Sequence, residues 1–159
     1  MIKNQDIFDD SLFRANVGIM LVNADHKIMA GEAYHYPGEW MMPQGGIDHP
    51  ESPEEAMKRE LIEETTLEFA DTRLLREHDQ WLGYKLGKPL EKDGKTYIGQ
   101  RQKWFLLEYL GPLPDATKAQ DREFSQFDWV SPDWLLNKTA RFKHGLYCEV
   151  FAVFDNYLP

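Results

Sequence analysis

Three glutamates, Glu60, Glu63 and Glu64, are spaced so that a helix would place all of them on one face. Residues three and four positions apart are neighbours on a helix surface. Carboxylates held this close repel one another unless a cation lies among them, and carboxylate oxygens suit a hard divalent ion such as Mg²⁺ or Mn²⁺. The spacing is therefore compatible with a metal site, although a glutamate-rich helix face is more often a solvated surface.

The residues around these glutamates predict a helix from about Pro53 to Thr65. Ser52 can cap its N-terminus, and Glu55 can complete a capping box with Ser52. Proline suits the first helical position. The glycines Gly45 and Gly46 precede the helix in a loop whose backbone can approach a ligand or offer a carbonyl to a metal.

The longer stretch from Gly45 to Leu67 resembles the Nudix box, G-x5-E-x7-R-E-U-x-E-E-x-G-U, where U is aliphatic. The matching residues are Gly45, Glu51, Arg59, Glu60, Leu61, Glu63, Glu64 and Leu67. Thr66 stands where the family usually has glycine, and this departure falls on the turn after the helix. Glu51 and Arg59 are expected to form a structural pair, because a guanidinium can hold a carboxylate with two hydrogen bonds.

The similarity extends over most of the chain, from about Arg14 to Tyr147, and indicates one branch of the family. That branch holds the bacterial RNA pyrophosphohydrolases and the asymmetric diadenosine tetraphosphate hydrolases. The similar stretches include Tyr97 to Leu107, and within it the run I-G-Q-R-Q-K-W-F, residues 98–105, is specific to this branch. The resemblance implies an α/β fold, a Nudix-type α/β/α sandwich with a mixed β-sheet. We expect one such domain over residues 1–159, with a flexible N-terminus over residues 1–11.

The resemblance also implies a metal site. Two or three Mg²⁺ or Mn²⁺ ions would be held by carboxylates and by the backbone of the glycine loop. These ligands are Glu60, Glu63, Glu64, Glu123, Gly45 and Gly46. The four glutamates are also the catalytic candidates, and the sequence leaves open which of them is the general base.

Substrate contacts are carried over in the same way. Arg14, Lys103 and Lys143 would face the phosphates of the substrate, and Tyr84 and Phe142 would flank its base. Without the resemblance, Arg14 and Lys143 fit equally well as surface charges. Tyr84 would then be a half-buried strand residue, and Phe142 a core residue of the last helix.

The implied activity is that of a metal-dependent pyrophosphohydrolase, which cleaves phosphoanhydride bonds in nucleotide polyphosphates. The expected substrates are 5′-triphosphorylated RNA ends, dinucleoside polyphosphates, or both. Tyr34 and Glu39 stand where relatives on the RNA side tend to have an arginine and a small polar residue, which weakens the RNA interpretation. The alternatives are a nucleoside triphosphate or nucleotide-sugar hydrolase of the family and a non-catalytic nucleotide-sensing module, although such modules usually lose the box carboxylates.

The composition suits one globular domain: 159 residues, of which 42% are hydrophobic and 13% aromatic. The net charge of −9 argues against extended nucleic-acid binding, because phosphate contacts need a basic surface. There is no long apolar run, so we expect no membrane span. Cys148, the single cysteine, cannot form an internal disulfide, which favours the cytoplasm. We expect it to be a packing residue.

The remaining elements must bring these residues together. Apolar runs and turn signals predict strands over residues 16–22, 27–32, 72–78, 81–86, 102–109 and 127–130, with a turn at 92–95. Ser131 and Pro132 open a short helix, and a last helix is expected from Phe142 to Tyr157. Its apolar stripe comprises Leu146, Val150, Val153, Phe154 and Tyr157.

Overall fold

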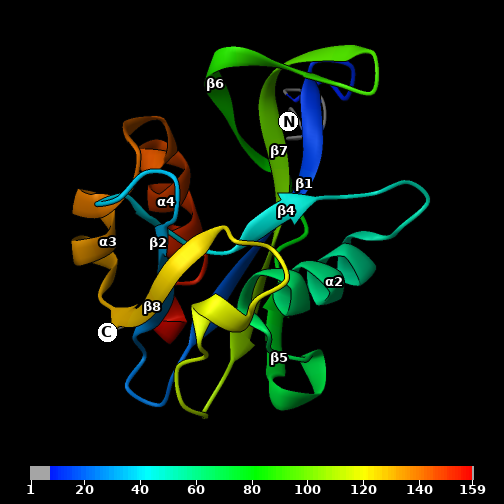
Figure 1. The fold of residues 1–159 in the computed structure, drawn as a ribbon. Coiled ribbons are helices and arrows are strands. Elements are labelled where there is room, and N and C mark those ends of the chain that lie inside the picture. Colours follow the sequence, from blue (N-terminus) through cyan, green and yellow to red (C-terminus); the bar gives the residue numbers. More distant parts are fainter. Residues whose placement is uncertain (1–7, 159) are drawn as a thin grey trace.

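A mixed β-sheet centred on strand β1 (Phe13–Val22) organises the chain (Figure 1). The structure is a computed structural model that describes residues 8–158. Strand β1 pairs in parallel with β7 (Lys95–Glu108) over its whole length. On its other side β1 pairs antiparallel with β2 (Ile28–Ala33) and β4 (Gln44–Gly46). Strand β4 leads into the glutamate-bearing helix. Because β1 pairs with β4, β1 helps to position that helix.

The other strands extend the sheet at both edges. Strands β3 (Trp40–Met41) and β8 (Phe124–Val130) pair with β2, and β5 (Arg73–Glu77) pairs with the C-terminal part of β7. Strand β6 (Leu82–Lys92) forms a hairpin with the N-terminal part of β7, beyond the body of the sheet (Figure 1). The turn predicted at 92–95 closes this hairpin, with positive φ at Asp93 and Gly94.

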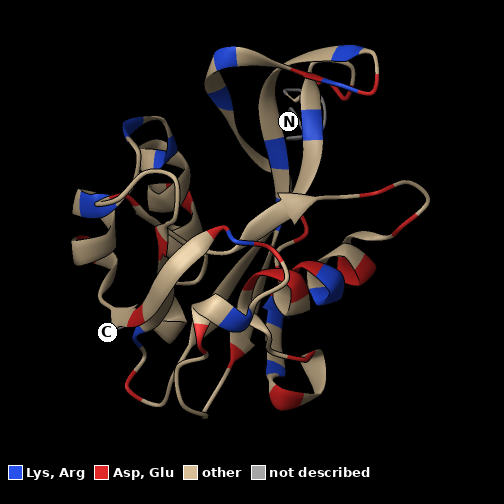
Figure 2. Ribbon diagram, in the orientation of Figure 1, with Lys and Arg blue, Asp and Glu red and all other residues tan. Residues whose placement is uncertain are grey.

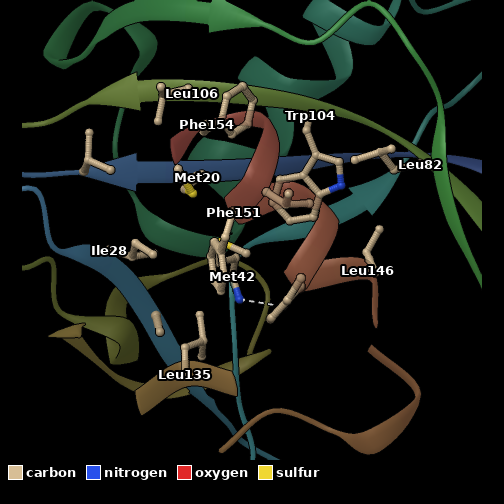
Figure 3. Packing of buried hydrophobic residues seen from close by; sticks show 14 of the residues in the cluster. Met20, Ile28, Met42, Leu82, Trp104, Leu106, Leu135, Leu146, Phe151 and Phe154 are labelled. Atoms are coloured by element: carbon tan, nitrogen blue, oxygen red, sulfur yellow. Dashed lines mark hydrogen bonds between the residues drawn. The ribbon is translucent and has the colours of Figure 1, made fainter. Parts of the chain in front are cut away.

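Helices cover both faces of the sheet, as the sandwich prediction requires. Alternate residues of β1 enter two hydrophobic clusters: Val17, Ile19 and Leu21 pack toward helix α2 (Pro53–Thr65), whereas Met20 and Val22 pack toward helix α4 (Arg141–Val153). Figure 3 shows the α4 side, where Trp104, Leu106 and Phe154 surround Met20. A Cβ on Gly18 would lie 2.3 Å from the Trp104 ring, so this ring requires a glycine in β1.

Helix α3 (Pro132–Lys138) and three 3₁₀ turns complete the described chain: η1 (Phe69–Asp71), η2 (Ala116–Lys118) and η3 (Asp155–Tyr157). None of the helices within residues 8–158 combines the length and apolar composition needed to cross a bilayer. Of the N-terminus expected to be flexible, residues 1–7 lie outside the described part.

The structure corrects two predictions for the last helix. It ends at Val153, and Tyr157 belongs to the 3₁₀ turn that follows. Cys148 is exposed and is therefore no packing residue. The buried stripe of α4 is Lys143, Leu146, Tyr147, Val150 and Phe151, and position 148 falls on the opposite side.

Candidate active site

Helix α2 has the predicted bounds and the predicted cap. The Ser52 hydroxyl accepts a hydrogen bond from the Glu55 N–H at 3.1 Å, and the Glu55 carboxylate accepts one from the Ser52 N–H at 3.3 Å. The helix ends at Thr66, whose φ of 70° is left-handed. Where the family usually has glycine, a β-branched residue therefore adopts an unfavourable conformation.

Arg59 joins helix α2 to the segment that precedes it. Its guanidinium donates two hydrogen bonds of 2.8 Å to the Glu51 carboxylate, which confirms the predicted pair. It also donates to the Gly46 carbonyl and to the Glu60 carboxylate at 2.8 Å, and to Glu63 at 3.1 Å. One lone pair of the Gly46 carbonyl is thereby engaged, which leaves the other for a further ligand.

Carboxylates from two segments converge beside this arginine. Glu60 and Glu63 of α2 and Asp121 of the loop before β8 each place an oxygen within 4.8 Å of the others. Glu64 and Glu123 line the same cavity, of about 350 Å³, together with Glu60 and Asp121. Gly45 allows this arrangement, because a Cβ there would lie 1.9 Å from the Glu60 carboxyl carbon.

The sequence does not single out Asp121 as a site residue. Its N–H donates a hydrogen bond of 2.9 Å to the Glu63 carbonyl, which ties the loop to the end of α2. The only signal in the sequence is its position two residues before Glu123, and a loop acid carries no periodicity that would distinguish it.

The carboxylates of α2 are crowded and poorly solvated. Burial raises the pKa of Glu60 to about 6, and the neighbouring Glu63 and Asp121 add to this effect. Burial, together with the charges of Glu60 and Glu123, raises the pKa of Glu64 well above its ordinary value. A hard divalent cation would remove both causes, since it repays the lost solvation and screens the repulsion. The residues present therefore fit the predicted metal site.

Gln44 connects these carboxylates to a buried cation. Its backbone N–H donates to Glu64 at 3.3 Å, and its side-chain oxygen accepts a hydrogen bond of 3.0 Å from the Lys143 ammonium. Burial lowers the pKa of Lys143 to about 8, and Glu64, Glu39 and Glu123 oppose that shift. Lys143 thus reaches the cavity from α4, on the other face of the sheet from α2.

The predicted substrate residues fall into two groups. Arg14 and Lys143 line the cavity. The Arg14 guanidinium packs against Gly46 so closely that a Cβ on that glycine would lie 2.0 Å from a guanidinium nitrogen. Lys103 does not line it: its ammonium donates to the Asp79 carbonyl at 2.5 Å and lies 5.2 Å from the centre of the Trp81 ring.

Tyr84 and Phe142 contact each other directly, with ring centres 5.7 Å apart, which leaves no room for a base between them. Tyr84 is buried, and its hydroxyl donates to the Gln100 amide oxygen at 2.9 Å. Phe142 is 48% exposed, so its outer face is open to a ligand. The structure therefore stacks one predicted base contact behind the other.

A sequence model of the NUDIX domain matches residues 12–150 of the chain. The chain belongs to the Nudix family. Its Nudix relatives include the RNA pyrophosphohydrolase of Klebsiella pneumoniae (strain 342), which is 40% identical over 152 residues, covering 93% of this chain and 86% of the relative. The chloroplastic Nudix hydrolase 26 of Arabidopsis thaliana is 36% identical over 157 residues, covering 92% and 71% of the two chains.

Solved Nudix structures share the fold at lower identity. The Caenorhabditis elegans Ap4A hydrolase binary complex superposes with a TM-score of 0.63 at 17% identity, covering 90% of this chain and 98% of that one. The Escherichia coli dihydroneopterin triphosphate pyrophosphohydrolase gives a TM-score of 0.66 at 14% identity, covering 89% and 98%. These similarities confirm the predicted α/β sandwich of a Nudix hydrolase.

Proposed function

We propose that this Nudix hydrolase cleaves a phosphoanhydride bond in a nucleotide polyphosphate, with the 5′-triphosphate end of RNA as its main substrate. One observation carries the reaction type: carboxylates from α2 and from the loop before β8 meet in one cavity, and burial raises the pKa of two of them. Such a group of acids is costly to fold without a cation, so a cation site explains it.

Mg²⁺ or Mn²⁺, in two or three ions, would be held by Glu60, Glu63, Glu64 and Glu123, with Asp121 added by the geometry. The backbone of Gly45 and Gly46 lies beside them and would contribute a carbonyl. Ions bound there would neutralise phosphate charge and lower the pKa of a bound water.

Glu123 is the carboxylate that we assign as general base. It lines the cavity and is exposed, and no residue within 8–158 donates a hydrogen bond or forms an ion pair with its side chain. Glu63, the other candidate, is held by Arg59 at 3.1 Å. Glu123→Gln should therefore lower kcat by about a hundredfold or more and leave KM little changed. An unchanged kcat would reduce Glu123 to an ordinary loop acid.

The cations and the exposed ring would bind the substrate. Lys143 and Arg14 both line the cavity and would stabilise phosphate charge, including that on the leaving group. Phe142 would stack on the first base with its open face, while Tyr84 supports its other face. Lys103 has no part in this proposal, because its ammonium is engaged with Asp79 and Trp81.

RNA is placed first because the RNA pyrophosphohydrolases among the relatives are similar along nearly the whole chain, for example at 40% identity over 93% of it. Dinucleoside polyphosphates remain the second candidate, since they present the same chain of phosphates and a base. The test measures hydrolysis of a triphosphorylated RNA, diadenosine tetraphosphate, a nucleoside triphosphate and a nucleotide sugar side by side, with Mg²⁺ and with chelator. Faster hydrolysis of any of the other three substrates would refute RNA as the main substrate, and a preference for diadenosine tetraphosphate would support the second candidate. Turnover with chelator would refute the metal requirement.

We also propose a single domain and a cytoplasmic location. The first rests on the family match over residues 12–150, and the second on the single cysteine of the chain.

A further inference from the structure

A second cavity adjoins the proposed active site. It has a volume of about 570 Å³ and lies between the tip of the β6–β7 hairpin and the segment that follows β4. Arg14 lines both cavities. Neighbouring residues also line the two cavities along β1, where Ala15 lines the second and Asn16 the first, and at the end of β4, where Ile47 lines the second and Gly46 the first. The two cavities therefore lie side by side, with Arg14 at their shared border.

The hairpin that bounds this second cavity is basic in an acidic protein. Residues 82–103 hold six of the 18 lysines and arginines and only two carboxylates, whereas the chain as a whole has a net charge of −9. Figure 2 shows these cations gathered on the hairpin, apart from the acidic residues of α2. Within residues 8–158, none of the six forms an ion pair.

Three of these cations line the second cavity. Lys92 and Lys95 are exposed and pair with each other across the hairpin turn, and Arg101 lies on β7 beside Ala15 of β1. Half-buried Tyr97 lies on the same wall and offers an aromatic face. A basic track with an aromatic side chain is the usual equipment for binding single-stranded nucleic acid.

Acidic residues on the cavity wall reduce this charge only in part. Asp48 lies 3.4 Å from the Arg59 guanidinium, so its charge is partly neutralised within the protein. Asp10 and Asp93 also line the cavity, the latter at the hairpin turn. With Arg14 included, four cations face these three aspartates.

We infer that this second cavity binds the ribose-phosphate backbone of the RNA nucleotides immediately downstream of the 5′ end. The inference rests on the proposed function, which places the 5′ polyphosphate in the first cavity. Cavities of roughly 300–1,000 Å³ hold a drug-sized ligand, so this one has room for roughly one or two nucleotides. A nucleoside triphosphate or a dinucleoside polyphosphate has no phosphodiester to place there, so the cavity would favour RNA over both.

The test varies RNA length and hairpin charge together. The charge-reversed variant Lys92→Glu/Lys95→Glu alters exposed residues at the turn, and Lys92→Gln/Lys95→Gln is a milder version if that protein folds poorly. The control Lys27→Glu/Lys138→Glu makes the same change in net charge at exposed lysines away from both cavities. Dissociation constants are measured with Mg²⁺ for 5′-monophosphorylated RNAs of two, four and twenty nucleotides, at two or more salt concentrations.

For the unaltered protein, affinity should rise from two nucleotides to four and change little from four to twenty. The Lys92→Glu/Lys95→Glu variant should bind the four-nucleotide RNA roughly tenfold more weakly, with a salt slope smaller by about 0.7 for each phosphate that the hairpin no longer binds. Its affinity for the dinucleotide, which has a single phosphodiester, should fall less than its affinity for the four-nucleotide RNA, and every affinity of the control should stay unchanged.

Equal losses in the hairpin variant and the control, or no loss in either, would overturn the inference. Hydrolysis of the triphosphorylated RNAs is measured separately. Absence of turnover on all of them would refute the proposed reaction, whereas the cavity assignment stands or falls on the binding series.

Discussion

Two glutamates, Glu51 just before helix α2 and Glu64 within it, have opposite electrostatic environments. Glu51 receives two hydrogen bonds of 2.8 Å from Arg59, and these lower the pKa of its carboxyl. Glu64 is more deeply buried, and the Gln44 N–H, at 3.3 Å, is the one donor to it within residues 8–158, while burial and its acidic neighbours raise its pKa. Among residues 8–158, no cationic side chain forms an ion pair with it.

The difference separates residues that stabilise the fold from residues that are kept for a ligand. A carboxylate with a bidentate guanidinium lowers the free energy of the folded state. A buried carboxylate among other carboxylates raises it, and such a group persists where binding or catalysis requires it. Arg59 marks the boundary, because it also contacts Glu60 and Glu63 but does not reach Glu64.

The largest expected effect comes from Glu64→Gln. We expect turnover to fall by about a hundredfold or more, since a metal ligand is lost. The melting temperature of the metal-free protein should hold or rise, because one charge leaves a crowded, buried group. Steady-state kinetics with Mg²⁺ and thermal unfolding with chelator measure the two effects. A variant that keeps more than about a hundredth of the activity would contradict the assignment.

Glu51→Gln is the matched change on the other side of the comparison. It should lower the free energy of unfolding by about 1–3 kcal/mol, because it weakens charge-assisted hydrogen bonds and leaves Arg59 underpaired. Urea unfolding of the metal-free proteins measures the loss. Equal stabilities of this variant and the unaltered protein would show that the pair does not hold the loop to the helix.

The pH dependence of stability sharpens the same comparison. The pKa of Glu60 in the folded protein is about 6, above its ordinary value of 4.5, so the folded state binds its proton more tightly. Its contribution to stability is therefore present below pH 4.5 and is lost as pH rises through 6. In chelator, the free energy of unfolding of Glu60→Gln, relative to that of the unaltered protein, should rise by about 1–2 kcal/mol from pH 4.5 to pH 7.5.

Glu51→Gln should show the opposite trend, because the pKa of Glu51 is lowered on folding. Its deficit relative to the unaltered protein should shrink as the pH falls through the folded-state pKa of Glu51. Parallel trends in the two variants, measured by urea unfolding across the pH range, would remove the distinction between the two environments.

The smallest expected effect is at Thr66, which lies outside both environments. Its left-handed φ of 70° disfavours a β-branched residue, and glycine adopts it without strain. Thr66→Gly should stabilise the protein by roughly 0.5–1 kcal/mol after the entropy of the unfolded glycine is counted. Kinetic constants should not change, since Thr66 does not line the cavity. Thermal unfolding and a steady-state assay check both statements.

Local signals in the sequence are sufficient to predict helix α2. Its cap and the spacing of its glutamates involve residues within four positions of one another, so neither depends on distant parts of the chain. The strands predicted for the β6–β7 hairpin are too short, because its outer residues, such as Lys95 and Thr96, are exposed on both faces and show no apolar alternation.

The site residues that the sequence misplaced or missed depend on tertiary placement. Lys103 belongs to the predicted strand, but its register directs the side chain to Trp81 and away from the cavity that Gln100 lines. Asp121 reaches the site through a loop, and the contact between Tyr84 and Phe142 depends on how α4 packs on β6. A single sequence does not determine any of these distances.

The parallel pairing of β1 with β7 also determines when the central sheet can be completed during synthesis. Phe13 pairs with Gly99 and Val22 with Glu108, so every rung of this ladder joins residues about 86 positions apart. Contacts this distant form slowly, because a long loop must close first. A chain emerging from the ribosome contains the residues of helix α2 before β7 is made, but it lacks the central rungs of the sheet until then. We expect nascent chains that stop before residue 95 to show the slowest amide hydrogens of β1 exchanging freely with solvent.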